Sequence, residues 1–244
     1  MSAIEMVCFP YAGGGAMSFN LLRRDLLAAG ARVNVTTVEL PGRGIRRDEA
    51  RFVDAVACAR SLAAELGDLL CAPHVLLGHS MGALLAYLVA QERISLGLRR
   101  PEAMVVAAAA APHLIEDPYG LEMIDDHDLA LELASFGGLP AGLLSQPEWL
   151  DALMPAIRDD LRICQSYRRS AAPPLPCPLH ILGAYHDPLV PVDALAAWAD
   201  YAIAPQPVRL FAGGHFLFQR SNPDVVTAIA GIADDALRQE EPAC

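Results

Sequence analysis

The sequence predicts an α/β fold with a mostly parallel sheet that carries helices on both faces. Short apolar runs alternate with helix-like segments along most of the 244 residues, and 54% of the residues are hydrophobic, enough to bury a large core. Repeated strand and helix units favour parallel strands with right-handed crossovers. The alternation stops between residues 113 and 170, which predicts a helical lid above the sheet edge. We expect a core of residues 1–112 and 171–244 with a lid of residues 113–170 inserted between two strands.

The first half of the chain is expected to supply four strands, at residues 7–10, 33–40, 74–77 and 103–108. Three helices are expected between them, at residues 19–30, 52–70 and 83–95. The first two have apolar residues at helical spacing on one face. The third is apolar on nearly all sides, which predicts that it is buried.

In the lid, Gly-Gly, Pro and Gly turns separate three expected helices, at residues 128–136, 146–154 and 156–167. The α/β alternation resumes after Pro173 and Pro174. There we expect strands at residues 179–183 and 208–211, with helices at residues 192–201 and 223–238.

Residues 78–82 read Gly-His-Ser-Met-Gly and lie between an apolar run and a helix-like segment. A G-x-S-x-G pattern in a strand, turn and helix context is typical of a nucleophile elbow, and it indicates Ser80 as a nucleophile. Gly78 and Gly82 are needed because the backbone on either side of Ser80 must approach closely. The alternative interpretation is an ordinary turn rich in Gly and Ser.

A serine hydroxyl needs a base, and the base needs a carboxylate that orients it. In this kind of fold the chain order is Ser, acid, His, each after a strand. Asp187 and His215 meet that order, because they follow the expected strands at residues 179–183 and 208–211. Asp187 precedes a proline and has the alternative role of a turn former, and His186 competes as a site residue. His79 is expected to pack or hydrogen-bond within the elbow.

Two backbone amides are expected to stabilise the oxyanion of a tetrahedral intermediate. The Met81 amide follows the nucleophile at a helix N-terminus, and the Ala12 amide lies in the Gly-rich loop after the first strand. Residues 13–15 are all glycine but lack the spacing and the Lys-Ser/Thr pair of a phosphate-binding loop, so a nucleotide site is not expected.

Composition excludes several classes of partner. The formal net charge of −11 argues against nucleic acid, and no apolar run is long enough to span a membrane. The N-terminus lacks the features of a signal peptide, and six cysteines without C-x-x-C spacing suggest reduced thiols and no zinc site. We expect a cytoplasmic, soluble monomer without a metal or cofactor, and with no membrane or nucleic-acid partner.

Several further motifs occur in a fixed order along the chain. They are CFPYAGGG (residues 8–15), LPGRG (40–44), GHSMGA (78–83), AP (111–112), FGGLP (136–140), LMPAIRDD (153–160) and GGHF (213–216). On these motifs the chain resembles the type II thioesterases associated with polyketide synthases and nonribosomal peptide synthetases, which belong to the α/β-hydrolase superfamily. One departure is Leu88, where the family commonly has Glu in a Glu-Leu-Ala run.

The resemblance implies an α/β-hydrolase fold and hydrolysis of acyl groups held as thioesters on the phosphopantetheine arm of an acyl or peptidyl carrier protein. Members of the family remove aberrant or stalled acyl units, an editing activity. The substrate-binding residues we expect are Tyr11, Phe136, Leu139 and Phe216. Other lid residues that could line an acyl pocket, or only hold the lid together, are Leu114, Ile115, Leu143, Leu144 and Trp149.

An arginine cluster formed by Arg43, Arg46, Arg47 and Arg51 is the only basic cluster of the chain. It could meet an acidic carrier protein or the pantetheine phosphate, and the alternative is a solvated charged loop.

Other functions remain compatible with the sequence. One is a fatty-acyl thioesterase of primary metabolism or a general carboxylesterase or lipase, and another is an inactive protein that binds carrier proteins. A macrocyclising terminal domain is a further alternative. The first strand begins close to Met1, which favours a free-standing hydrolase as the expectation.

Overall fold

The structure, a computed structural model, describes residues 3–115, 120–168 and 172–240. Its sheet has the strand order β2-β1-β3-β4-β5-β6, with β7 also paired to β5, and every pairing is parallel. This confirms the expected mostly parallel sheet. The strands are β1 (Ile4–Phe9), β2 (Val33–Thr37), β3 (His74–His79), β4 (Ala103–Ala107), β5 (Leu175–Ala184), β6 (Ala202–Pro205) and β7 (Arg209–Phe211).

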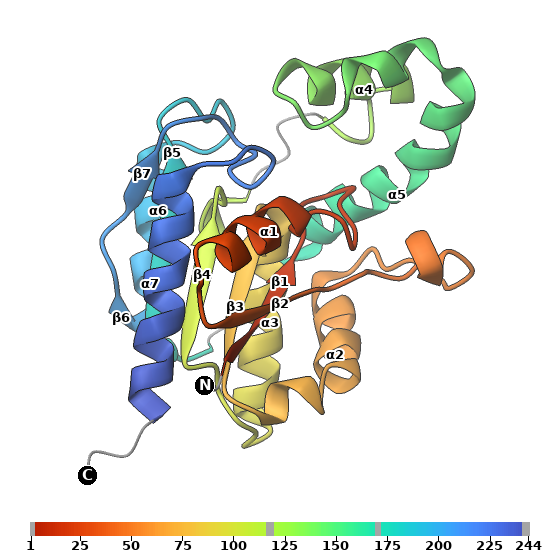
Figure 1. The fold of residues 1–244 in the computed structure, drawn as a ribbon. Coiled ribbons are helices and arrows are strands. Elements are labelled where there is room, and N and C mark those ends of the chain that lie inside the picture. The colour runs from red at the N-terminus through yellow and green to blue at the C-terminus, as the bar shows by residue number, and fades with distance from the viewer. Residues whose placement is uncertain (1–2, 116–119, 169–171, 241–244) are drawn as a thin grey trace.

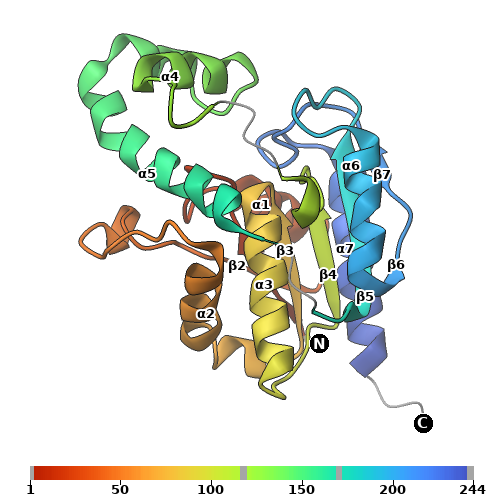
Figure 2. The ribbon, with the colours of Figure 1, turned by 180° about the vertical axis from the view of Figure 1, so that it is seen from behind.

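Helices cover both faces of the sheet, as expected. They are α1 (Asn20–Ala28), α2 (Ala55–Glu65), α3 (Met81–Ser95), α4 (Asp126–Ser135), α5 (Pro147–Ser166), α6 (Val192–Ala196) and α7 (Pro223–Glu240). Figure 1 looks onto the face covered by α1 and α7, and Figure 2 onto the face covered by α2, α3 and α6. Strand β1 divides its side chains between these faces, because Val7 and Phe9 join one core while Met6 and Cys8 join the other.

Helices α4 and α5 form a separate unit above the sheet, which we call the α4–α5 segment (residues 120–166). It has its own buried cluster, in which Leu129 and Leu133 of α4 pack with Leu150, Met154 and Ile157 of α5. The C-terminal half of α5 then runs back to the core (Figure 1). The expected lid boundary at residues 170 and 171 lies outside the described residues.

Helix α5 differs from the sequence prediction, because one helix replaces the two that were expected on either side of Pro155. A proline inside a helix removes one hydrogen bond and strains the preceding turn by about 3 kcal/mol. The apolar stripe nevertheless continues through it, since Leu150, Met154, Ile157 and Ile163 are all buried. Packing of this stripe therefore outweighs the local preference of the proline.

Strand β6 was not expected from the sequence. It is a short edge strand in which only Ala202 is buried and Ile203 is 69% exposed. An edge strand of this length has no alternating pattern to identify it. Helices α2 and α6 are also shorter than the helices expected at residues 52–70 and 192–201. Helix α2 begins after Asp54, whose side chain accepts a hydrogen bond from the Ala57 amide.

The turn between β3 and α3 has no room for side chains at its glycines. A Cβ on Gly82 would lie 2.0 Å from the carbonyl oxygen of Phe9 in β1, and one on Gly78 would lie 2.3 Å from the Ala83 Cα. Between them Ser80 has φ 54° and ψ −120°, a conformation that L residues rarely adopt. The close approach of three backbone segments therefore holds Ser80 in a strained turn.

We expect Gly82→Ala to lower the free energy of unfolding by about 3 kcal/mol or more, because neither backbone can move away from the added methyl group. The matched control is Gly231→Ala in α7, where an added Cβ meets nothing within 4 Å. That change should raise the free energy of unfolding by up to about 1 kcal/mol, since alanine favours helix over glycine. Urea denaturation of both variants measures the difference, and equal stabilities would contradict the packing argument.

Candidate active site

The structure places the three predicted catalytic residues at one edge of the sheet. Ser80 follows β3, Asp187 follows β5 and His215 follows β7. The carboxyl ends of parallel strands meet at the same edge, where α/β proteins commonly bind ligands. His215 and Asp187 are in direct contact, and Ser80 and His215 line one cavity.

Asp187 and His215 form a buried hydrogen-bonded pair. The Nδ1 of His215 lies 2.9 Å from Oδ2 of Asp187, and their side chains are 4% and 1% exposed. The amides of Leu189 and Val190 also donate to Asp187 Oδ1. Burial by itself raises the pKa of the Asp187 carboxyl. The hydrogen bond from His215, the charge of His215 and the two amide bonds lower this pKa by more than burial raises it, so the pKa lies below its usual value. Because Nδ1 of His215 bonds to Asp187, Nε2 is the ring nitrogen left to accept a proton.

His79 connects the elbow to the His215 loop. It is buried, and its Nε2 lies 2.8 Å from the backbone oxygen of His215, to which it donates. Burial, followed by the nearby His215, lowers the pKa of His79 to about 3, so its ring is neutral. His79 was expected to pack or hydrogen-bond within the elbow. Its ring is buried against other rings, and its hydrogen bond is to the backbone of His215.

The proposed oxyanion donors lie on segments that meet at the elbow. Met81 is the first residue of α3, and Ala12 belongs to the loop between β1 and α1. In that loop the Gly13 amide donates to Asp160, the Gly14 amide to the Tyr11 carbonyl and the Gly15 amide to the Ser18 hydroxyl. A phosphate-binding loop uses such amides for its ligand, whereas these three already have partners within the protein.

A mainly apolar cavity of about 590 Å³ opens beside Ser80. Its walls come from α3, the end of β4, the following turn, α5 and the loop after Asp187. The side chains include Leu84, Leu114, Ile115, Leu161, Cys164, Leu189 and Val190. Leu114 and Ile115 were expected to line an acyl pocket, whereas the lining residues from α3, α5 and the loop after Asp187 were not expected.

Comparison with known proteins decides the family. The sequence model of the thioesterase domain matches residues 5–236 of this chain. The chain belongs to the thioesterase domain family. One relative of similar length is the gramicidin S biosynthesis protein GrsT of Aneurinibacillus migulanus. It is 28% identical over 223 residues, which are 91% of this chain and 86% of that protein.

Two solved thioesterases have the same fold. The RedJ thioesterase from the prodiginine pathway of Streptomyces coelicolor has a TM-score of 0.87 and is 32% identical, with 95% of this chain and 91% of that chain covered. The type II thioesterase BorB from the borrelidin biosynthetic cluster has a TM-score of 0.81 and is 33% identical, with 97% and 93% covered. Family membership and fold therefore agree with the resemblance seen in the motifs.

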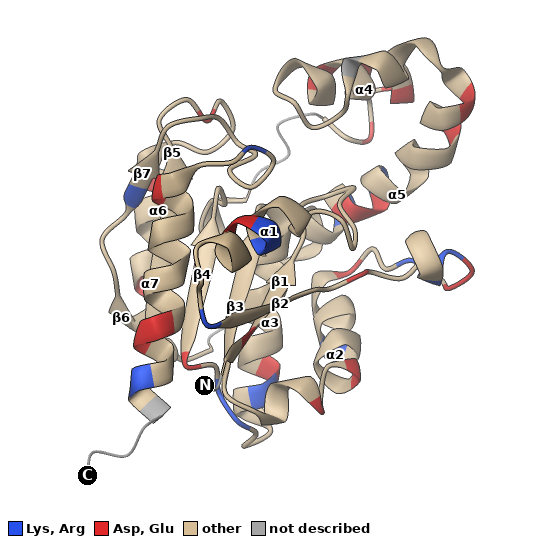
Figure 3. Cartoon of the chain, viewed as in Figure 1, with Lys and Arg blue, Asp and Glu red and all other residues tan. Residues whose placement is uncertain are grey.

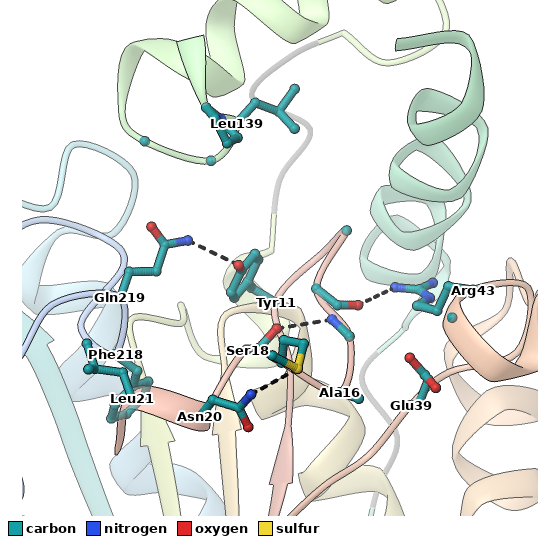
Figure 4. A pocket seen from close by; sticks show the side chains of 18 residues that line it. Tyr11, Ala16, Ser18, Asn20, Leu21, Glu39, Arg43, Leu139, Phe218 and Gln219 are labelled. Atoms are coloured by element: carbon teal, nitrogen blue, oxygen red, sulfur yellow. Dashed lines mark hydrogen bonds between the residues drawn. The ribbon is translucent and has the colours of Figure 1, made fainter. Parts of the chain in front are cut away.

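The four predicted substrate-binding residues of this thioesterase lie outside the cavity at Ser80. Tyr11 and Leu139 line a second cavity of about 820 Å³ (Figure 4), where Gln219 donates to the Tyr11 hydroxyl. Phe136 and Phe216 stack with ring centroids 6.3 Å apart and also contact the His215 ring. Of the other lid candidates, Leu143 and Leu144 pack within the α4–α5 segment, and Trp149 is 58% exposed.

The arginine cluster of residues 43–51 is largely neutralised within the thioesterase itself. Arg46 pairs with Glu49 and Glu65, Arg51 with Asp159, and Arg43 with Asp160. Figure 3 marks the positions of Asp and Glu on α4 and α5 in red and the mixed acidic and basic positions of the loop before α2. The arrangement is therefore neither a free basic patch nor a simply solvated loop, because two of these arginines bind α5.

Two further findings concern cofactors and membranes. Among residues 3–115, 120–168 and 172–240, no group of three or more His, Cys, Asp or Glu side chains is arranged to hold a metal ion. Within the same residues, none of the helices combines the length and apolar character that crossing a bilayer requires.

The buried neutral His79 should make the thioesterase less stable in acid. Below pH 6.5 the unfolded chain protonates this ring and the folded chain does not, so the free energy of unfolding falls as the pH drops. Between pH 7 and pH 5 we expect the wild type to lose about 2 kcal/mol more than His79→Gln, which keeps an N–H donor. The control is His127→Gln on the exposed side of α4. Equal losses in wild type and His79→Gln, measured by urea denaturation, would contradict this assignment.

Proposed function

We propose that this thioesterase hydrolyses acyl groups held as thioesters on the phosphopantetheine arm of a carrier protein in polyketide or nonribosomal peptide synthesis. The observation that carries the proposal is the buried Asp187 and His215 pair, in which His215 lines the same apolar cavity as Ser80. The likeness to GrsT, RedJ and BorB supports a biosynthetic setting, because their names assign them to gramicidin S biosynthesis, the prodiginine biosynthetic pathway and the borrelidin biosynthetic cluster.

The proposed reaction is a double displacement. His215 Nε2 takes the proton of the Ser80 hydroxyl while the Ser80 oxygen attacks the thioester carbonyl. The Met81 and Ala12 amides stabilise the oxyanion. The C–S bond then breaks, and the imidazolium returns the proton to the departing thiolate. In the second half His215 deprotonates a water molecule that attacks the acyl-enzyme, which releases the carboxylic acid and restores Ser80.

The α4–α5 segment is proposed to act as a lid, within the insertion of residues 113–170. Leu161 and Cys164 of α5 form part of the cavity wall beside Ser80, so the placement of α5 sets the shape of the cavity. The substrate is proposed to be an acyl unit that has stalled on its carrier, because hydrolysis frees the carrier thiol for another cycle. A thiolate is a good leaving group, so one histidine suffices as the general acid.

Loss of the nucleophile should abolish turnover. We expect Ser80→Ala to lower kcat by about 10⁴-fold or more, with the fold unchanged. The control is Ser95→Ala at the exposed end of α3, which should keep wild-type kcat. Mass spectrometry with acyl-carrier substrates should detect an acyl adduct on a peptide that contains Ser80. Substantial hydrolysis by Ser80→Ala would refute the mechanism.

The substrate class is tested by comparing kcat/KM for an acyl-carrier protein, the matching acyl-CoA and an aryl ester. We expect the carrier-bound thioester to have the largest kcat/KM. A preference for the aryl ester would favour a general carboxylesterase, and a preference for acyl-CoA would favour a fatty-acyl thioesterase of primary metabolism. Either preference would contradict the proposed editing role.

The cavity at Ser80 should limit the acyl group. Cys164→Phe would place a ring in the wall that α5 provides, so we expect kcat/KM for an octanoyl thioester to fall about tenfold. The value for an acetyl thioester should stay within about twofold, because a short acyl group does not reach this wall. Cys71→Phe, at an exposed cysteine, is the control. Equal losses for both substrates would contradict the cavity assignment.

A further inference from the structure

The loop between β1 and α1 carries the proposed oxyanion donor Ala12, and its fixation comes from outside the loop. The Gly13 amide donates to Asp160 Oδ2 at 2.7 Å, and Arg43 Nη1 donates to the Gly14 carbonyl at 2.8 Å. Figure 4 shows Arg43 reaching the loop from the side, with the internal bond to Ser18 beside it. The bond to Ser18 shapes the loop from within, and Arg43 and Asp160 tie the backbone of its glycines to other segments.

Arg43 and Asp160 also form a bidentate ion pair with each other. Arg43 Nη1 lies 2.7 Å from Asp160 Oδ2, and Arg43 Nη2 lies 2.5 Å from Oδ1. Their side chains are 12% and 2% exposed. Arg43 comes from the loop before α2, and Asp160 from α5. One ion pair thus joins three segments that are far apart in the sequence.

The burial of this pair argues for a role in positioning. A buried ion pair gives little net stability compared with apolar residues of the same volume, because both charges lose their water. Both partners here bond to the backbone of neighbouring residues of the same loop, Asp160 to the Gly13 amide and Arg43 to the Gly14 carbonyl. Helix α5 also packs directly on the loop, since a Cβ on Gly13 would lie 2.8 Å from Ile157 Cγ1, and Gly13 has φ +81°.

We propose that the Arg43 and Asp160 pair positions the Ala12 amide of the oxyanion hole, so that the hole is formed only when α5 is seated on the core. This inference rests on the proposed function. Ala12 immediately precedes Gly13, so the peptide unit held by Asp160 is next to the one that donates to the oxyanion. Asp160 and Arg43 are positioning residues and touch no reacting atom.

The inference has a kinetic signature. The oxyanion bond forms fully only in the transition state, so loss of its alignment lowers kcat and leaves KM nearly unchanged. Asp160→Asn keeps the size of the side chain but removes its charge, which weakens its bond to the Gly13 amide and its pairing with Arg43. We expect its kcat on a small acyl thioester to fall about 10- to 100-fold, somewhat less than for removal of an oxyanion donor.

The matched control is Asp159→Asn, one residue earlier on α5. Asp159 pairs with Arg51 and Arg162 and has no bond to the β1–α1 loop. Asp159→Asn removes the same charge from the same helix but leaves the bonds to the β1–α1 loop in place. We therefore expect its kcat and KM to stay within about twofold of wild type.

A second measurement separates positioning from general damage. An alkylboronic acid forms a tetrahedral adduct with Ser80 whose oxygen lies where the oxyanion forms, whereas the product acid binds without that adduct. Asp160→Asn should lower the affinity for the boronic acid by the same factor as it lowers kcat. It should change the affinity for the product acid by no more than about twofold. A merely structural role would weaken both ligands together.

Arg43→Lys is the second variant, in case Asp160→Asn does not fold. A lysine keeps the charge but cannot bond Asp160 with two nitrogens and also reach Gly14. We therefore expect a loss of kcat between that of Asp159→Asn and that of Asp160→Asn. If the folded variant matches Asp159→Asn in kcat and boronic-acid affinity, the inference is overturned. A wild type that hydrolyses no thioester would refute the proposed function instead, and the comparison of boronic-acid affinities would still test the positioning.

Discussion

Gly82 packs against the carbonyl of Phe9, and the rest of the site depends on this contact between the start of α3 and the end of β1. It forces the turn that leaves Ser80 with a positive φ, and it brings the Met81 amide beside the loop that begins directly after β1. The two proposed oxyanion donors come from different parts of the sequence. The segments that carry them approach each other where Gly82 lies against the backbone of Phe9 and Pro10, and a methyl group on Gly82 would push these segments apart.

Much of the fold and the three catalytic candidates could be predicted from the sequence, because their signals are local. Strand ends, glycine turns and the order of Ser80, Asp187 and His215 are all visible in short stretches. The remaining features depend on contacts between distant segments. The bond from His79 to the His215 backbone, the path of α5 through Pro155 and the walls of the cavity arise from packing that no single window of sequence contains.

The charge distribution explains why the arginine cluster is not a free basic patch. A chain with a formal charge of −11 offers many carboxylates to each arginine, and Arg43, Arg46 and Arg51 find theirs within the fold. Long-range attraction of an acidic partner would need a surplus of positive charge, which these pairs remove. A carrier protein would therefore be recognised through contacts made at short range.

Helix α5 contributes to the site twice within two turns, because Leu161 and Cys164 line the cavity while Asp160 holds the β1–α1 loop. Asp160 and Cys164 lie about one turn apart on α5, so a substitution that displaces the helix backbone would move both. Under the proposed function, selectivity and turnover would change together in such a variant. Mutations on α5 should combine non-additively, and an evolutionary change of substrate would require compensating changes in the loops that α5 touches.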